Sequence, residues 1–305
     1  MAQRHVPFEC KTTDGITLRG WFYAVDGPAP APAIVMTHGF NCVKEMTLPE
    51  TAENFQSLGY NVLLYDARSV GASDGEPRNQ LSPYQMAEDV SDVISYATTL
   101  PSVDPRRVLL WAMSFGAAVS ACTVAIDRRP RALVMVCPLL SFIRPDRRAK
   151  AFAQLIRDRQ SQLQGNEPFS LQPFNARGDN PIGMGGAGGP GGLEAHNLMK
   201  AAKERGHPSF RDRITLQTYY KLALFRPKEI METIEGVPVM MIIPELDDIS
   251  SPAEQQQAFD AMGTPKRLYL AKGQGHLSIL TGDGSQALFD ATADFFRDAL
   301  EGEIV

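Results

Sequence analysis

The chain has 305 residues, of which 44% are hydrophobic and 21% charged, and its net charge is −5 at pH 7. This composition is ordinary for a globular enzyme, and the negative charge gives no electrostatic reason to bind nucleic acid. No apolar run approaches the roughly 20 residues that span a bilayer, and the first residues lack the apolar centre of a secretory signal. We expect a cytoplasmic protein with one large core, or a core with a lid, that binds neither nucleic acid nor a membrane.

The first part of the chain predicts a hairpin followed by alternating strands and helices. Residues 6–11 and 16–23 alternate like strands around Thr13-Asp14-Gly15, which predicts a hairpin. The runs 33–37 and 60–65 are continuously apolar, as strands buried on both faces are, and a helix is predicted between them at 49–58. The same rhythm continues with helix 83–100, strand 108–112, helix 115–126 and strand 132–137. We expect an α/β fold with a mostly parallel central sheet flanked by helices.

The alternation of predicted strands and helices is interrupted between residues 141 and 235, where we find no strand pattern. A basic helical stretch with Phe152, Leu155, Ile156 and Leu163 on one side leads into a loop rich in Pro, Gly and Asn. A second helical stretch is predicted around 214–225. Strand 237–243, helix 252–262, strand 267–271 and helix 286–300 then resume the core. We therefore predict a core formed by residues 1–140 and 236–305, interrupted by a helical cap, or lid, at 141–235.

Ser114 stands between the apolar strand 108–112 and the helix 115–126, which predicts a strand, a sharp turn and a helix with a hydroxyl at the apex. Such a turn needs small neighbours two residues before and after the serine. Gly116 fits, and Ala112 replaces the usual glycine of G-x-S-x-G at the cost of one methyl group. Ser114 is thus a candidate nucleophile.

A serine hydroxyl needs a histidine to accept its proton and a carboxylate to orient that histidine. In a parallel sheet such groups gather beyond the carboxyl ends of the strands. Asp247 follows strand 237–243, and His276 follows strand 267–271 in a glycine-rich loop. The order Ser, Asp, His is that of α/β hydrolases. Asp248 is the alternative acid, whereas His38 lies in the wrong topological place and is expected to stabilise a turn.

The reaction also needs hydrogen-bond donors for an oxyanion. The backbone N–H groups of Phe115, directly after the serine, and of Phe40, at the end of strand 33–37, have the required positions.

The aromatic residues Phe142, Tyr219 and Tyr220 are candidates for an acyl pocket, although aromatic residues in a cap more often serve packing.

Three other features are discounted. The four cysteines, Cys42 among them, are scattered without a C-x-x-C pair, so neither a disulfide nor a metal site is expected, and no cofactor is expected either. The run from Gly183 to Gly188 matches G-x-G-x-x-G but follows no strand, and a flexible loop over the site entrance is the better interpretation. The basic residues near 144–159 are interrupted by Asp146 and Asp158, which favours a solvated helical face over a docking site for an acidic carrier protein or coenzyme A.

Several segments together resemble the α/β-hydrolase superfamily across nearly the whole chain. They are His38-Gly39-Phe40, residues 66–75, the turn at 112–116, Asp247 and Gly275-His276. Residues 216–227 look like the dienelactone-hydrolase-like branch that includes fungal polyketide transferases and thiohydrolases. This resemblance implies release or transfer of acyl chains from carrier thioesters in secondary metabolism. The resemblance also implies that some members of that branch use cysteine where this chain has Ser114.

The sequence thus predicts a serine-dependent hydrolase or acyltransferase that acts on an ester or acyl thioester through an acyl-enzyme. Its expected partner is a small acyl substrate, free or bound to a carrier protein or coenzyme A. Two alternatives stay open: the same residues could cleave a carbon–carbon bond or close a ring such as a lactone, or the chain could be a non-catalytic ligand-binding homologue. The sequence does not reveal the acceptor of the acyl group or the oligomeric state.

Overall fold

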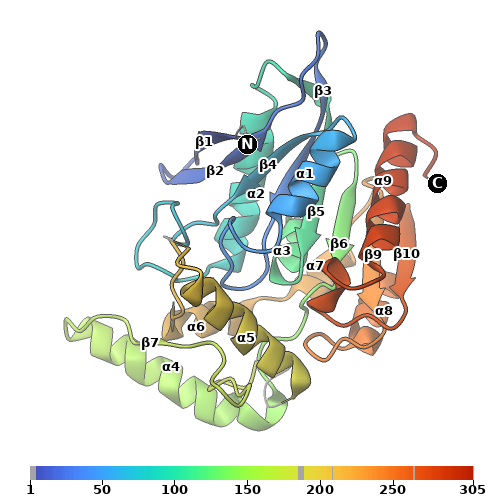
Figure 1. The fold of residues 1–305 in the computed structure, drawn as a ribbon. Helices are drawn as coiled ribbons and strands as arrows, with labels where there is room; N and C mark the ends of the chain where they lie inside the picture. The colour runs from blue at the N-terminus through green and yellow to red at the C-terminus, as the bar shows by residue number, and fades with distance from the viewer. Residues whose placement is uncertain (1–4, 185–188, 208, 264, 305) are drawn as a thin grey trace.

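The computed structural model describes residues 5–184, 189–207, 209–263 and 265–304. A sheet of eight strands forms its centre, in the order β1-β2-β4-β3-β5-β6-β9-β10 (Figure 1). The strands are β1 (Val6–Lys11), β2 (Thr17–Tyr23), β3 (Ala31–Thr37), β4 (Asn61–Tyr65), β5 (Val103–Met113), β6 (Leu133–Val136), β9 (Val239–Pro244) and β10 (Lys266–Ala271). The first two pairings are antiparallel and all others are parallel. The predicted sheet is confirmed, and the hairpin forms its edge.

Helices cover both faces of this sheet. They are α1 (Pro49–Ser57), α2 (Pro83–Ala97), α3 (Phe115–Val124), α8 (Pro252–Ala261) and α9 (Ser285–Glu301). Buried side chains of α1 and α9 pack in one apolar cluster, and those of α2, α3 and α8 pack in the other. The strands β3, β4, β6 and β9 supply both clusters with alternate residues, which explains why their sequences are continuously apolar.

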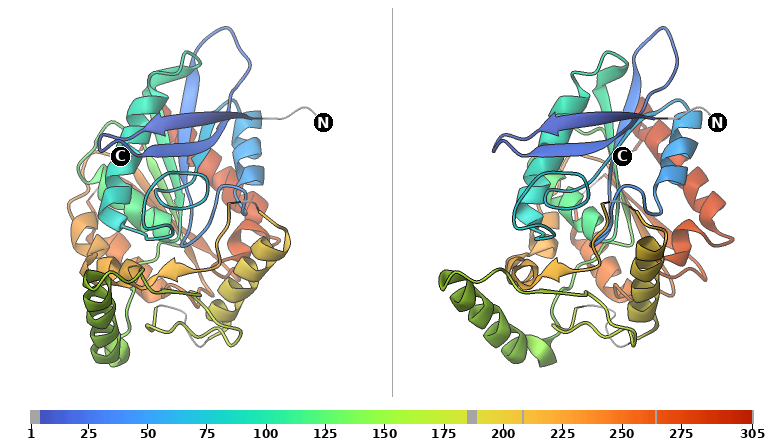
Figure 2. Two further views of the ribbon diagram at one scale, coloured as in Figure 1. Left: turned by 90° about the vertical axis from the view of Figure 1, so that its left-hand side faces the viewer. Right: turned by 60° about the vertical axis from the view of Figure 1, so that its left-hand side comes forward.

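The segment between β6 and β9 lies across the carboxyl ends of the parallel strands (Figures 1 and 2). It contains η1 (Pro145–Arg147), α4 (Arg148–Leu163), β7 (Ser170–Leu171), α5 (Pro190–Glu204), β8 (Ile214–Thr215), α6 (Leu216–Leu224) and α7 (Pro227–Met231). The expectation of no strand here was wrong, because β7 and β8 form a short antiparallel pair. Helix α5 occupies part of the predicted loop. Residues 185–188 of the predicted flexible glycine loop lie outside the described residues.

Two buried asparagines join this segment to the loops of the core. Asn79 donates its side-chain N–H to Asn41 Oδ1 at 2.9 Å, and Asn41 donates to the carbonyl of Arg211 at 3.2 Å. Both asparagines have positive φ, 55° and 54°, which this side chain tolerates better than most. The segment is therefore held directly over the loop that follows β3. Among the described residues, no helix combines the length and the apolar character needed to cross a membrane.

Candidate active site

Ser114 occupies the turn between β5, which ends at Met113, and α3, which begins at Phe115. Its backbone angles are φ 56° and ψ −120°, a conformation that a non-glycine residue adopts only under strain. Gly116 makes this turn possible, because a Cβ on it would lie 2.3 Å from the carbonyl oxygen of His38. The helix therefore starts in direct contact with the end of β3, and the hydroxyl of Ser114 is held at the apex.

His276 lies next to this hydroxyl. It comes from the loop after β10, is 3% exposed, and places Nε2 2.8 Å from Ser114 Oγ. Its Nδ1 lies 2.9 Å and 3.1 Å from the two carboxylate oxygens of Asp247. A carboxylate only accepts hydrogen bonds, so Nδ1 carries the proton and Nε2 is free to accept one from Ser114. The three side chains form one continuous line of hydrogen bonds.

Asp247 follows β9 and is held by four groups. Its Oδ1 accepts the backbone N–H groups of Ile249 and Ser250, each at 2.8 Å, and its Oδ2 accepts the side-chain N–H of Gln255 at 3.0 Å and that of His276. The side chain is buried. These donors compensate the burial of the negative charge and fix the carboxylate against the imidazole.

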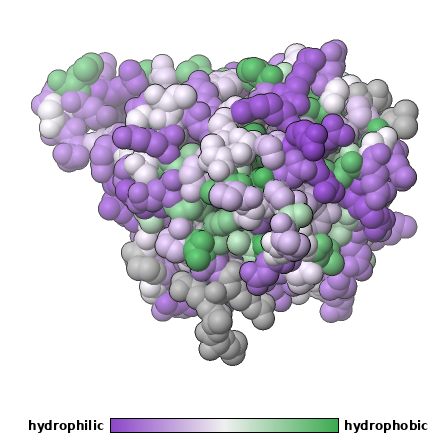
Figure 3. All heavy atoms as spheres, turned by 90° about the horizontal axis from the view of Figure 1, so that it is seen from above, coloured by the Kyte–Doolittle hydropathy of each residue, from purple (hydrophilic) through white to green (hydrophobic). Residues whose placement is uncertain are grey.

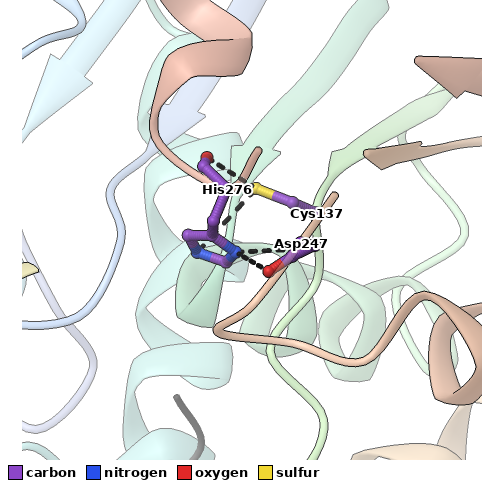
Figure 4. A group of neighbouring side chains, drawn as sticks. All are labelled: Cys137, Asp247 and His276. Atoms are coloured by element: carbon purple, nitrogen blue, oxygen red, sulfur yellow. Dashed lines mark hydrogen bonds and ion pairs between the residues drawn. The ribbon is translucent and has the colours of Figure 1, made fainter. Parts of the chain in front are cut away.

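Two contacts around this line were not foreseen. The side chain of Gln255 is fully buried, bridges Asp247 to the carbonyl of Ser250, and has no motif that would reveal it in the sequence. Cys137, after β6, donates its S–H to the carbonyl of His276 at 3.6 Å, as Figure 4 shows. Asp248, the alternative acid, is exposed. The structure thus brings Asp247, and not its neighbour, to the histidine.

The thiol, carboxylate and imidazole of Cys137, Asp247 and His276 lie within 4.8 Å of one another, close enough to share a metal ion (Figure 4). Their chemistry does not suit one. Burial, with the nearby charge of Asp247, raises the pKa of the Cys137 thiol well above its usual value, so it stays protonated, whereas metals bind the thiolate. Both imidazole nitrogens already have partners. The arrangement fits proton transfer better than metal binding.

The backbone N–H groups of Phe40 and Phe115 are the predicted donors for an oxyanion. Phe115 is the first residue of α3, so its N–H precedes the first hydrogen bond within the helix. Among the described residues, the N–H of Phe40 has no backbone acceptor. A Cβ on Gly39 would lie 3.5 Å from Ser114 Cβ, which places the Gly39–Phe40 turn beside the serine. The role of these two N–H groups as oxyanion donors stays a prediction.

A cavity of about 390 Å³ opens onto Ser114 and His276. Its wall is mostly apolar, and Glu194 is the only acidic or basic side chain besides His276 among the described residues that line it. The apolar lining comes from Phe40, Met113, Leu139, Phe174, Met184, Ala195, Leu198, Met199, Ile249, Leu277 and Leu280. A hydrocarbon chain would be well accommodated here.

The three aromatic residues expected to line this cavity do not reach its surface. The Tyr219 side chain is fully buried behind Phe40, and its hydroxyl accepts a hydrogen bond from Asn180 at 2.8 Å. Phe142 packs edge-on against Phe115 and faces a separate groove. Tyr220 lies under the guanidinium of Arg159. The expectation was wrong because Tyr219 and Phe142 pack against the core and Tyr220 packs within the segment, which is the packing role that the sequence left open.

Helix α5 supplies the wall instead, through residues 194, 195 and 197–199. The glycines and proline at its start had suggested a loop. Pro190 stands in the first turn, where it lacks only an N–H that is unsatisfied anyway. Gly191 is required by close packing, since a Cβ there would lie 2.6 Å from Ile249. The buried spacing of Ala195, Met199 and Ala202 was the signal for a helix.

His38 and Cys42 lie close to the serine but are poor reactive groups. His38 is buried, its Nε2 has no partner among the described residues, and burial lowers its pKa to about 4. Burial raises the pKa of the Cys42 thiol to about 12. Cys42 is therefore a protonated thiol at neutral pH, and it contributes to the cavity wall.

Comparison with known proteins shows the family of the chain. The profile of the family described as "Serine aminopeptidase, S33" matches residues 28–281. A thiohydrolase from Eupenicillium brefeldianum is 41% identical over 290 residues, covering 95% of this chain and 92% of the relative. Polyketide transferase af380 from Aspergillus fumigatus is 36% identical over 295 residues, covering 96% and 98%.

A solved structure of DcsB in complex with its substrate analogue is 56% identical, with a TM-score of 0.93 and coverage of 97% of this chain and 99% of that one. The similarity therefore extends over both the core and the segment between β6 and β9. The chain belongs to the serine aminopeptidase S33 family and is an enzyme of the α/β-hydrolase class.

Proposed function

We propose that this enzyme is a serine-dependent thioesterase or acyltransferase that acts on an apolar acyl thioester or ester. The observation that carries the proposal is the hydrogen-bonded line Ser114–His276–Asp247 opening onto a largely apolar cavity. The names of the similar fungal proteins, thiohydrolase and polyketide transferase, support a polyketide-derived acyl group delivered as a thioester in secondary metabolism.

In the first half of the reaction, Ser114 Oγ attacks the carbonyl carbon while His276 Nε2 takes its proton. Asp247 stabilises the imidazolium that forms, and the N–H groups of Phe40 and Phe115 hold the oxyanion. The tetrahedral intermediate then collapses. The carbon–sulfur or carbon–oxygen bond breaks, His276 returns the proton to the leaving thiol or alcohol, and the acyl group stays on Ser114.

In the second half, water or a hydroxyl group attacks the acyl-enzyme and His276 accepts its proton. Collapse of the second intermediate releases an acid, an ester or a lactone, and His276 returns the proton to Ser114. Exclusion of water favours transfer over hydrolysis. The apolar wall that α5 and Leu277 form around the serine is suited to this exclusion.

The test is turnover of the octanoyl thioester of N-acetylcysteamine by the full-length enzyme. Ser114→Ala should lower kcat/KM by at least about 10³-fold, because the nucleophile is lost while binding remains. Ser120→Ala, which removes a buried hydroxyl of α3 that faces Thr37 rather than the cavity, is the matched control and should keep the activity.

A fluorophosphonate provides an independent reading, because only an activated serine should react with it. We expect a single adduct on Ser114 of the wild type and none on Ser114→Ala. An active Ser114→Ala variant, or a wild-type protein that binds acyl chains without turnover or labelling, would refute the proposal. The second result would favour a non-catalytic ligand-binding homologue.

A further inference from the structure

Positive charge is concentrated in the segment between β6 and β9. Residues 141–235 contain 15 Lys and Arg and 10 Asp and Glu, whereas the rest of the chain contains 15 and 25. The segment is thus net positive on an otherwise strongly negative molecule. Such a separation of charge steers a partner of the opposite sign toward one part of the surface.

The acids that interrupt the basic run near 144–159 do not neutralise its outer surface. Asp146 pairs with Arg144 and Arg147, at 3.0 Å and 3.5 Å. Asp158 is buried and faces inward, where its carboxylate accepts hydrogen bonds from the side chain of Gln217 and from a backbone N–H. The exposed charged residues of α4 are therefore all basic.

The cations on α4 itself lack acidic partners. Arg148, Lys150 and Arg157 are exposed, and none forms an ion pair with any residue that the structure describes. Arg159 lies over the ring of Tyr220, with its guanidinium 4.9 Å from the ring centre. These charges are available to an external anion or acidic side chain.

Large apolar side chains are also exposed on α4. Phe152 is 44% exposed, Ile156 47% and Leu163 90%. Their spacing places them on one side of the helix together with two of the arginines. This α4 stripe consists of Arg148, Phe152, Ile156, Arg159 and Leu163. One end of α4 projects from the molecule at the lower left of Figure 1. In Figure 3, which views the molecule from above, the projecting corner at the upper left has hydrophobic and hydrophilic side chains side by side.

A groove of about 340 Å³ continues the stripe toward α7. Arg148, Phe152 and Arg226 line it, so it combines apolar surface with cationic groups. Exposed apolar surface surrounded by arginine is the composition of a protein interface, and the charges select an acidic partner.

The residues directly before α4 contact a stretch of chain that leads into the wall of the catalytic cavity. The backbone N–H of Arg144 donates to the carbonyl of Gly183 at 2.9 Å, and a Cβ on Gly183 would lie 2.6 Å from Arg147 Cγ. The next residue, Met184, lines the cavity beside Ser114. A protein docked on α4 would therefore lie close to the wall of the site that receives the acyl chain.

We propose that the outer face of α4 is the docking surface for an acidic protein that carries the acyl chain as a thioester, an inference that rests on the proposed thioester chemistry. The α4 stripe supplies the apolar contact. Arg148, Lys150 and Arg157 attract acidic side chains of the carrier. The flexible arm that bears the thioester then delivers the acyl group to Ser114.

The test compares two substrates that differ only in the carrier. One is octanoyl-N-acetylcysteamine, and the other is an acidic acyl carrier protein with octanoate on its phosphopantetheine thiol. Combined reversal of charge in Arg148→Glu, Lys150→Glu and Arg157→Glu should lower kcat/KM for the carrier-bound substrate at least tenfold, mainly through KM. Turnover of the small thioester should stay within a factor of two. Added salt should weaken the wild-type reaction with the carrier and have less effect on the variant.

The matched control reverses three exposed cations outside residues 141–235, in Lys11→Glu, Arg106→Glu and Arg131→Glu. It makes the same change in net charge and should leave both reactions unchanged. Equal losses in the two triple variants would overturn the docking surface in favour of a general charge effect. An α4 variant that keeps wild-type kcat/KM for the carrier, or a wild type that uses only the small thioester, would also overturn it.

Failure of the proposed function has a different signature, since neither substrate would then be turned over.

A lipid surface is the other class of partner that a basic apolar helix could meet. Co-sedimentation with vesicles that contain one third phosphatidylserine separates the two. Sedimentation that the α4 variant abolishes, with no change in carrier kinetics, would replace the acidic protein by a membrane.

Discussion

At the level of single residues, the site depends on side chains whose hydrogen-bonding capacity is fully used. Asp247 receives four donors, and His276 uses both ring nitrogens. Four hydrogen-bond donors compensate most of the free energy that burial of the carboxylate charge costs, and they hold the carboxylate in one orientation. The residues that fix Asp247 should therefore influence the rate of reaction without touching the substrate.

Gln255 provides the clearest test of this positioning role. Gln255→Leu keeps the volume but removes the donor to Asp247 Oδ2 and the bond to the Ser250 carbonyl. A hydrogen bond to a charged group contributes about 1.5–3 kcal/mol, so kcat should fall by about tenfold or more with little change in KM.

Gln256→Leu is the control, because the hydrogen bond of that side chain within the described residues goes to the exposed Asp260. It should leave kcat unaltered. A Gln255→Leu variant that alters KM alone would show that the residue shapes the pocket and does not position the carboxylate.

His38 should make stability depend on pH. Burial lowers its pKa to about 4, whereas the unfolded chain has the ordinary value of 6.5. The unfolded state therefore binds the proton more tightly, and the stability that the neutral ring provides is present above pH 6.5 and lost as the pH falls toward 4. The loss amounts to about 3 kcal/mol.

The measurement is the free energy of unfolding in urea between pH 4 and pH 7. His38→Gln, which has no titrating group, should show a shallower decline on the acid side than the wild type. Parallel curves for the two proteins would mean that His38 is solvated or already charged in the folded state.

At the level of elements, the strained turn at Ser114 exists because β3, β5 and α3 meet closely. Gly116→Ala should destabilise the protein by about 1–3 kcal/mol and reduce activity, since the new Cβ would lie 2.3 Å from the His38 carbonyl and must displace either β3 or α3.

Thermal unfolding and turnover of the small thioester measure the two effects together. Gly27→Ala is the control, because a Cβ there has only one neighbouring atom, at 4.0 Å, in an exposed link. If Gly116→Ala matched the stability and rate of Gly27→Ala, the close approach would have no role in holding the serine.

The side chains of Asn41 and Asn79 both donate to the carbonyl of Arg211, which ties the segment over the site to the loops of the core. Glycine preserves the positive φ at either position, so Asn41→Gly and Asn79→Gly each remove the amide without adding backbone strain. Each should lower the free energy of unfolding by about 1–3 kcal/mol through the loss of a buried hydrogen bond.

The double variant should be less destabilised than the sum of the two single ones, with a coupling of about 0.5–3 kcal/mol from urea denaturation. Simple addition of the two effects would indicate that the two asparagines act independently.

At the level of the whole molecule, the sheet could be predicted because its central strands are continuously apolar and alternate with helices. The same regularity located the groups that meet at Ser114, since they follow the carboxyl ends of β3, β5, β9 and β10. The limits of the cap at 141 and 235 stay a prediction.

The parts that the sequence did not predict depend on how elements pack. Gly191 and Pro190 suggested a loop, yet they start α5, because the helix must approach Ile249 closely. Tyr219 and Phe142 were assigned to the cavity, but an apolar side chain in a cap can face the core, a neighbouring helix or the ligand. The orientation of α6 against the core determined this for Tyr219, and the contact with Phe115 determined it for Phe142.

The measurement that tests the central claim most directly is mass spectrometry of the enzyme quenched during turnover of an octanoyl thioester. The account predicts a mass increase of one octanoyl group on the peptide that contains Ser114, and its disappearance in Ser114→Ala. Turnover without a covalent adduct, or an octanoyl group found on Cys42 or any other residue, would contradict it.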